Sequence, residues 1–149
     1  MSKHDEADLI LKLYELRREE VMRKARDWYF RDFNPESVAD VTNAMFSEQG
    51  GYLRMVMSYW DMAAALVKHG AISNEFFNDT NGEFLGVFAK LEPLLGELRA
   101  NMGPQFLANL EKLIDDTKGG RERVAEMRER FKFIRAEMAA RQTRAAGQS

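Results

Sequence analysis

The sequence predicts an all-α protein, a single-domain bundle of about six to seven helices around one buried central helix at residues 52–69. Apolar residues recur at helical spacing along nearly the whole chain, and no segment alternates like a strand. Glycines and prolines fall mainly between the periodic segments. With 149 residues, 45% of them hydrophobic, the chain is long enough to bury one core. We therefore expect one domain at residues 1–144 and a disordered tail at 145–149.

The segment at 52–69 is the expected hub of the bundle. At about 100° per residue, its polar side chains fall in one narrow strip that includes Arg54, Asp61 and Lys68. Apolar side chains fill the rest of the circumference, so this helix needs neighbours on several sides. The sequence leaves open whether the polar strip is buried or faces solvent.

The chain before this hub is expected to form two helices. Residues 5–33 contain no Gly or Pro, and i,i+4 pairs such as Glu19 with Arg23 stabilise a helix by about 0.2–0.5 kcal/mol each. One long helix is therefore predicted there. Asn34-Pro35 is a typical cap and first helical residue, which predicts a second helix at 35–46. Gly50-Gly51 then interrupts the chain before the hub.

The chain after the hub is expected to form a short turn and then a long amphipathic helix. Gly70 is a typical C-cap, and Ser73 is a typical start for a short helical turn. The capping-box spacing of residues 80–83 predicts the start of a helix that runs to residue 102. Its apolar residues share an arc of about 120°, and Pro93 should bend its axis.

Two more helices are expected to complete the bundle. Gly103-Pro104 starts the first of them, and Gly119-Gly120 ends it. The last helix, from about residue 121 to 141, carries apolar residues at the 3-4-3-4 spacing of a coiled coil. Residues 118–149 contain nine basic and four acidic side chains, a net charge of +5 in a chain whose overall net charge is −2.

Two helical faces are candidate contact surfaces for self-association. Opposite the apolar arc of the helix at 83–102 lie small residues and a proline, although an exposed helical glycine costs about 1 kcal/mol relative to alanine. A closely packed neighbouring helix would explain them, and so would simple tolerance on a surface helix. The second face is the apolar seam of the last helix. The candidate interface residues are Gly86, Ala89, Pro93 and Gly96 on the first face, and Val124, Met127, Phe131, Ile134 and Met138 in the seam.

Catalytic and metal-binding patterns are missing from the sequence. There is no cysteine, and neither His4 nor His69 has the acidic residue three positions earlier that a ferritin-like di-iron site requires. No phosphate-binding loop or nucleophile elbow occurs. We therefore expect no metal and no cofactor, and we favour a non-catalytic role. The cysteine-free composition, without an apolar run of about 18 residues, predicts a cytoplasmic protein that does not span a membrane.

Three functions from different classes remain open. The favoured one is a non-catalytic helical protein–protein interaction module that self-associates, most simply as a homodimer. A small-molecule binding or sensing domain would instead use a cavity beside the central helix, lined by Tyr59, Trp60, Asp61 and His69. The basic last helix could also bind nucleic acid, but its four glutamates and the low overall charge disfavour that function.

Three segments resemble a pattern found in uncharacterised bacterial helical proteins grouped as a domain of unknown function: LVKHGAI at 66–72, FFNDTNGEF at 76–84 and FAKLEPLLGELR at 88–99. In that pattern, an apolar helix ending in LVxxGxI is followed by a short connection and by a helix carrying LxPxLxxxR. The resemblance implies an all-helical fold in which Pro93 and Arg99 are positions of the pattern. It implies no activity, substrate or cofactor.

Overall fold

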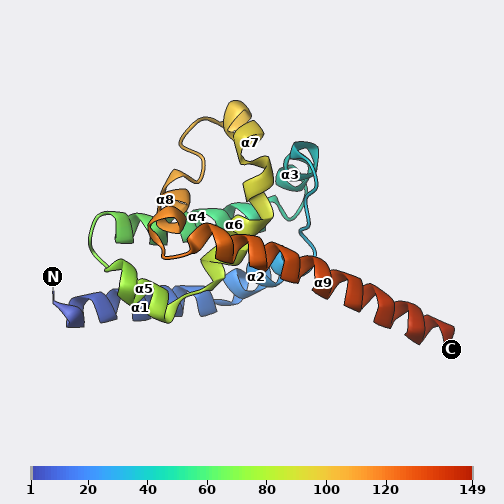
Figure 1. The fold of residues 1–149 in the computed structure, drawn as a ribbon, viewed down its shortest axis with the longest axis horizontal. Helices are drawn as coiled ribbons and strands as arrows, with labels where there is room; N and C mark the ends of the chain where they lie inside the picture. The colour runs from blue at the N-terminus through green and yellow to red at the C-terminus, as the bar shows by residue number, and fades with distance from the viewer. Residues whose placement is uncertain (1, 149) are drawn as a thin grey trace.

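The computed structural model describes residues 2–148, which form nine α-helices and one 3-10 helix and contain no strand. The all-α prediction is confirmed (Figure 1). The helices are α1 (Lys3–Arg18), α2 (Glu20–Arg31), α3 (Val38–Met45), α4 (Gly50–Lys68), α5 (Asn74–Thr80), α6 (Glu83–Leu91), η1 (Glu92–Leu94), α7 (Leu95–Met102), α8 (Ala108–Asp116) and α9 (Gly120–Gly147).

Helix α4 is the hub that the apolar pattern predicts. It packs mainly against α2 and α8, and also against α3 and α6. Leu53 and Trp60 are fully buried among these neighbours. The polar strip faces solvent at Arg54 and Lys68 and is half-buried at Asp61. Burial on several sides therefore explains why apolar residues cover most of the circumference of this helix.

The prediction of one helix at 5–33 is wrong, because the chain breaks between α1 and α2. Glu19 leaves the helical region, with φ −57° and ψ 144°. Its carboxylate accepts hydrogen bonds from the backbone N–H groups of Val21 and Met22, at 3.1 and 3.0 Å. These two bonds lower the pKa of Glu19. Glu19 thus caps α2 instead of supporting a continuous helix through its i,i+4 pair with Arg23.

The predicted helix at 83–102 is also divided. Pro93 lies in η1, between α6 and α7, because proline cannot supply the backbone N–H that a continuous α-helix requires. The predicted capping box is not formed. Thr80 ends α5, and its hydroxyl donates to the carbonyl of Phe76 at 3.0 Å, while Gly82 precedes α6 without a side-chain cap.

Helix α9 is longer than predicted. Its 28 residues span about 42 Å at 1.5 Å per residue, and its first part packs against α6 and α8. The rest extends beyond the other helices (Figure 1). Of the expected disordered tail, residues 145–147 belong to α9, and Ser149 lies outside the described residues. We call residues 132–147 the α9 arm.

Candidate functional site

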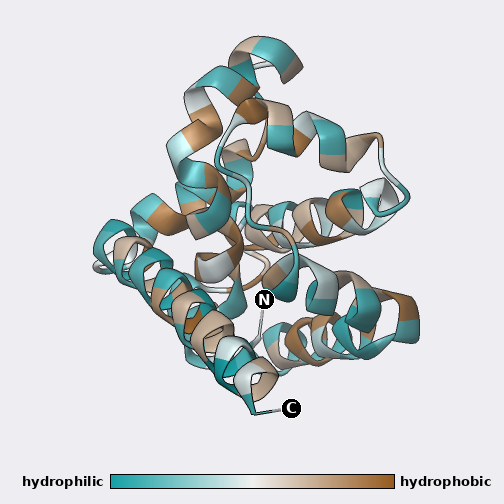
Figure 2. Ribbon diagram, turned by 90° about the vertical axis from the view of Figure 1, so that its right-hand side faces the viewer, coloured by the Kyte–Doolittle hydropathy of each residue, from teal (hydrophilic) through white to brown (hydrophobic). Residues whose placement is uncertain are grey.

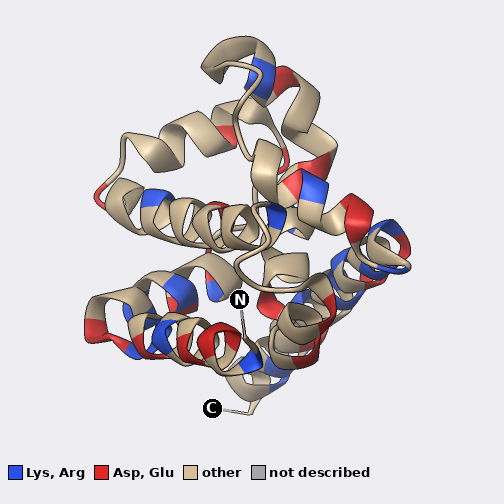
Figure 3. Cartoon of the chain, turned by 90° about the vertical axis from the view of Figure 1, so that its left-hand side faces the viewer, with Lys and Arg blue, Asp and Glu red and all other residues tan. Residues whose placement is uncertain are grey.

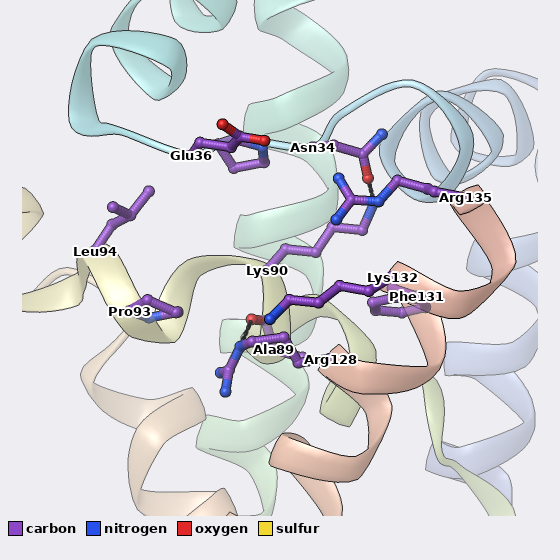
Figure 4. Close-up of a pocket in the computed structure, with 11 residues that line it drawn as sticks. Asn34, Glu36, Ala89, Lys90, Pro93, Leu94, Arg128, Phe131, Lys132 and Arg135 are labelled. Carbon is purple, nitrogen blue, oxygen red and sulfur yellow. Dashed lines mark hydrogen bonds between the residues drawn. The ribbon is translucent and has the colours of Figure 1, made fainter. Parts of the chain in front are cut away.

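A cleft of about 320 Å³ lies at the base of the α9 arm, where α9 meets η1 and the connection between α2 and α3 (Figure 4). Basic side chains dominate it. The charged and aromatic residues that line it are Glu36, Lys90, Arg128, Phe131, Lys132 and Arg135. The cleft is where the packed part of α9 ends, so these residues determine how the arm leaves the body.

Lys90 forms the floor of the cleft and is buried. Its Nζ donates hydrogen bonds to the carbonyl oxygens of Tyr29 and Phe33 at 2.9 and 2.7 Å. It also donates to the side-chain oxygen of Asn34 at 3.0 Å. Burial, with a smaller contribution from the nearby Arg135, lowers the pKa of Lys90 to about 8. Because the carbonyls belong to the end of α2 and the residues after it, Lys90 ties α6 to the negative end of the α2 dipole.

A network of ion pairs fixes the first part of α9 to the body. Arg128 donates to the carboxylate of Glu92 at 2.6 Å and to the carbonyl of Ala89 at 2.9 Å. Glu92 also accepts from Arg121 at 2.7 Å, and Arg121 pairs in addition with Glu111 at 2.9 Å. These side chains are only partly buried, so each pair adds little stability, but together the pairs fix the orientation of the helix. The start of α9 is therefore held in one position relative to α6, η1 and α8.

The candidate face opposite the apolar arc of the helix predicted at 83–102 is divided between the interior and the surface. A Cβ atom on Gly86 would lie 3.1 Å from ring atoms of both Phe131 and Phe30, so α9 packs closely over this glycine. Ala89 is buried as well. Pro93 and Gly96, however, are exposed, and nothing lies within 4 Å of the Cβ position of Gly96. The neighbouring helix that the small residues suggested is present at Gly86, and it belongs to the same chain.

Substituting the two glycines with leucine should therefore give different results. We expect Gly86→Leu to lower the free energy of unfolding by about 2–3 kcal/mol, because the new side chain overlaps the rings under α9. Gly96→Leu should change it by about 0.5 kcal/mol or less, since the site is open. Urea denaturation followed by circular dichroism compares the two variants. Equal losses would contradict the close packing of α9 on α6.

The predicted seam of α9 is covered at one end only. Val124 is fully buried, and Met127 and Phe131 are partly buried against the core. Ile134 and Met138, which continue the same face, are 43% and 46% exposed. The seam thus begins as part of the core and continues onto the arm without a partner in the described residues.

Sequence reasoning missed three residues of this region. Lys90 carried a signal, because it is the one charged residue between Phe84 and Leu91. Arg135 lines the cleft as one of many basic residues in the last helix and had no distinguishing pattern. Phe133 lies off the 3-4-3-4 seam and is 69% exposed, so periodicity alone did not select it.

The polar groups of Tyr59, Trp60 and Asp61, three of the four residues predicted to bind a small molecule, have partners on three different helices. The Tyr59 hydroxyl donates to the carbonyl of Leu13, and the Trp60 indole N–H donates to the carboxylate of Glu83 at 3.1 Å. Asp61 accepts from the backbone N–H of Leu110 at 2.9 Å, which ties α4 to α8. His69 is exposed at the end of α4. These contacts serve packing, and ligand binding by this set stays a prediction.

Among residues 2–148, no group of three or more histidine, aspartate or glutamate side chains is arranged to hold a metal ion. In the same part of the chain, no helix is both long enough and apolar enough to cross a membrane.

The comparisons with known proteins identify a family. A family model described as a domain of unknown function, DUF4760, matches residues 4–117. The match reaches well beyond the segments at 66–99 that carried the resemblance, and it ends before α9 begins. Neither a curated protein nor a solved structure matches the chain. Since the family model covers more than half of the sequence, the chain belongs to the DUF4760 family.

Proposed function

We propose that the protein is a non-catalytic helical interaction module that self-associates through the α9 arm. The observation that supports the proposal is the incomplete burial of the seam. Val124 is part of the core, whereas Ile134 and Met138 on the same face are nearly half exposed beyond the body. In Figure 2, which looks onto the end from which the arm projects, hydrophobic and hydrophilic residues alternate along it. An apolar helical face that continues past the packed core is typical of a contact surface.

The energetics favour a partner for the arm. Most of the stability of a protein helix comes from packing of its apolar face, and the arm extends beyond the helices on which the first part of α9 packs. Full burial of a Phe, Ile or Met side chain stabilises an assembly by about 1.5–3 kcal/mol. The arm exposes one of each, at Phe133, Ile134 and Met138. A second copy of the chain is the simplest partner, since most soluble oligomers are homo-oligomers and the two-fold dimer is the commonest of them.

We also propose a location, an origin and a non-enzymatic role from the sequence. The cysteine-free composition favours a cytoplasmic location. The resemblance implies a bacterial origin. No arrangement of side chains described above suggests a base, a nucleophile and a stabilising group for catalysis, so the interaction role is preferred to an enzymatic one.

Light scattering after size-exclusion chromatography tests the proposal. The wild-type protein is expected to elute as a dimer at micromolar concentrations, and Ile134→Glu/Met138→Glu as a monomer, because two charges are placed in the apolar contact. Helical circular dichroism should show that the variant stays folded.

A control introduces a single glutamate elsewhere on the same helix. Ala125 is exposed on the packed part of α9, outside the arm and off the seam. Ala125→Glu is expected to remain dimeric. A wild-type protein that is monomeric throughout this concentration range would refute the proposal, and dissociation by Ala125→Glu would show that the effect of charge is not specific to the arm.

A further inference from the structure

An acidic surface with an exposed aromatic side chain lies next to the cleft. Residues 32–53 contain no Lys or Arg. Within residues 2–148, none of the carboxylates of this stretch takes part in an ion pair. The ring of Phe46, at the end of α3, is 88% exposed. We call this region the α3 surface, and its exposed charged and aromatic residues are Asp32, Glu36, Asp40, Phe46 and Glu48.

The α9 arm has the opposite charge and a similar apolar component. It contains four basic side chains and one acidic, a net charge of +3. Arg135 makes no hydrogen bond or ion pair with another described residue. Phe133 is 69% exposed. The basic residues of the arm are Lys132, Arg135, Arg141 and Arg144.

The two surfaces are complementary in charge, and each exposes a large aromatic side chain. Phe46 and Phe133 are the two most exposed of the large hydrophobic side chains in the described chain. In Figure 3, the ribbon of α3 and of the loop that follows it shows acidic residues and no basic ones, in agreement with the sequence. Each surface therefore offers an exposed aromatic side chain. On the α3 surface the charged side chains are all acidic, and on the arm they are mostly basic, with Glu137 as the exception.

We propose that the α9 arm of one copy docks on the α3 surface of a second copy, and that the exchange is reciprocal. This inference rests on the proposed self-association and specifies its contact surfaces. Both surfaces flank the same cleft, which Glu36 lines from one side and Lys132 and Arg135 line from the other (Figure 4). A two-fold axis that exchanges arm and α3 surface therefore forms both contacts at once, as a closed two-fold dimer requires.

Charge favours this arrangement over direct pairing of the two arms. An arm-to-arm seam would bring together two helices of charge +3, and like charges in contact oppose association. Docking on the α3 surface pairs each arm with four carboxylates. Exposed ion pairs contribute little each, so the charges select the partner surface while burial of Phe46 and Phe133 supplies more of the affinity. Dimerisation should weaken as salt is raised, since the pairs are exposed.

Charge reversal on each surface tests the inference. Glu36→Lys/Glu48→Lys changes the α3 surface, at side chains without hydrogen bonds in the described structure. Arg141→Glu/Arg144→Glu changes the arm. Each double variant alone is expected to raise the dimer dissociation constant about tenfold or more, because like charges replace opposite charges at the substituted positions of both contacts.

Mixing the two variants should restore the dimer. In the mixed dimer the wild-type arm meets the wild-type α3 surface, and the reversed arm meets the reversed surface, so the substituted positions again carry opposite charges in both contacts. A single chain that carries all four substitutions should also dimerise. Sedimentation velocity, with one variant labelled by a fluorophore, measures each dissociation constant.

The possible results separate this inference from the proposed function. If Glu36→Lys/Glu48→Lys dimerises like the wild type, the α3 surface is not the partner, and self-association through the arm stands. If the wild type is monomeric, both are refuted. If the wild type is monomeric but binds duplex DNA or RNA in a salt-dependent manner that Arg141→Glu/Arg144→Glu removes, the arm is a nucleic-acid contact instead.

Discussion

Replacing Gly50 with alanine is expected to lower the free energy of unfolding by about 3 kcal/mol or more. Gly50 is the first residue of α4, and its N–H donates to the carbonyl of Ser47 at 3.0 Å in the tight turn after α3. A Cβ atom there would lie 2.1 Å from the carbonyl oxygen of Met45. Because the overlapping atom belongs to the backbone, no rotation of a side chain can relieve the clash. The turn must open, and α3 must move away from α4.

The neighbouring glycine is the control. Gly51 is also helical, but nothing lies within 4 Å of its Cβ position. Gly51→Ala should stabilise the protein by about 0.4–1 kcal/mol, because alanine reduces the conformational entropy of the unfolded chain. Urea denaturation at one fixed protein concentration compares the variants, since the proposed dimerisation would make stability depend on concentration. Similar stabilities for the two alanine variants would disprove the tight turn.

The glycine pairs illustrate what local sequence can predict. Both Gly50-Gly51 and Gly119-Gly120 were expected to lie between helices, and a new helix does begin at each pair. Gly50, Gly51 and Gly120, however, are already the first residues of α4 and α9. Which glycine is indispensable follows only from the backbone path. At the second pair it is Gly120, whose Cβ would lie 2.0 Å from the carbonyl oxygen of Ile114. A Gly-Gly dipeptide predicts that the chain turns. Which of the two glycines contacts a backbone carbonyl depends on the position of the preceding helix.

The helix breaks at Glu19 and Pro93 were also not predicted correctly, because they too depend on local contacts. Glu19 is a common helix residue and an unusual N-cap, so neither propensity nor spacing indicated that its carboxylate would cap α2. At Pro93 the sequence indicated a bend, and the structure contains a 3-10 segment that divides the helix. Helix identity followed from periodicity over many residues, whereas helix ends depended on single side chains and their tertiary contacts.

The candidate site was predictable in part. Spacing placed Val124, Phe131, Ile134 and Met138 on one face of the last helix, and the structure has them there. Spacing could not show where the body beneath that face ends, since this depends on how far α6 extends along α9. The α3 surface had a compositional signal, the lack of Lys and Arg in residues 32–53, but no motif that indicated a contact.

Replacing Lys90 with methionine is expected to lower the free energy of unfolding at pH 7 by about 2–3 kcal/mol. Methionine keeps most of the volume but leaves the carbonyl oxygens of Tyr29 and Phe33 and the side-chain oxygen of Asn34 without their donor. Unpaired buried acceptors cost about 1–3 kcal/mol each, partly offset because the buried ammonium no longer has to be desolvated. Lys132→Met, at an exposed lysine of the same cleft, should cost about 0.5 kcal/mol or less.

The pH dependence of this difference provides an independent check. Burial lowers the pKa of Lys90 in the folded protein from the usual 10.5 to about 8. Between these pH values the unfolded chain still binds the proton that the folded chain has released. The contribution of Lys90 to the free energy of unfolding of the wild type therefore increases with pH. The neutral amine still donates two hydrogen bonds. The difference in free energy of unfolding between the wild type and Lys90→Met should therefore grow from pH 8 to pH 10.5. Burial raises the pKa of Tyr29, and because Tyr29 is present in both proteins its contribution cancels from this difference. A difference that stays constant or shrinks over this range would show that the Lys90 ammonium is stabilised by its oxygen partners more than burial destabilises it.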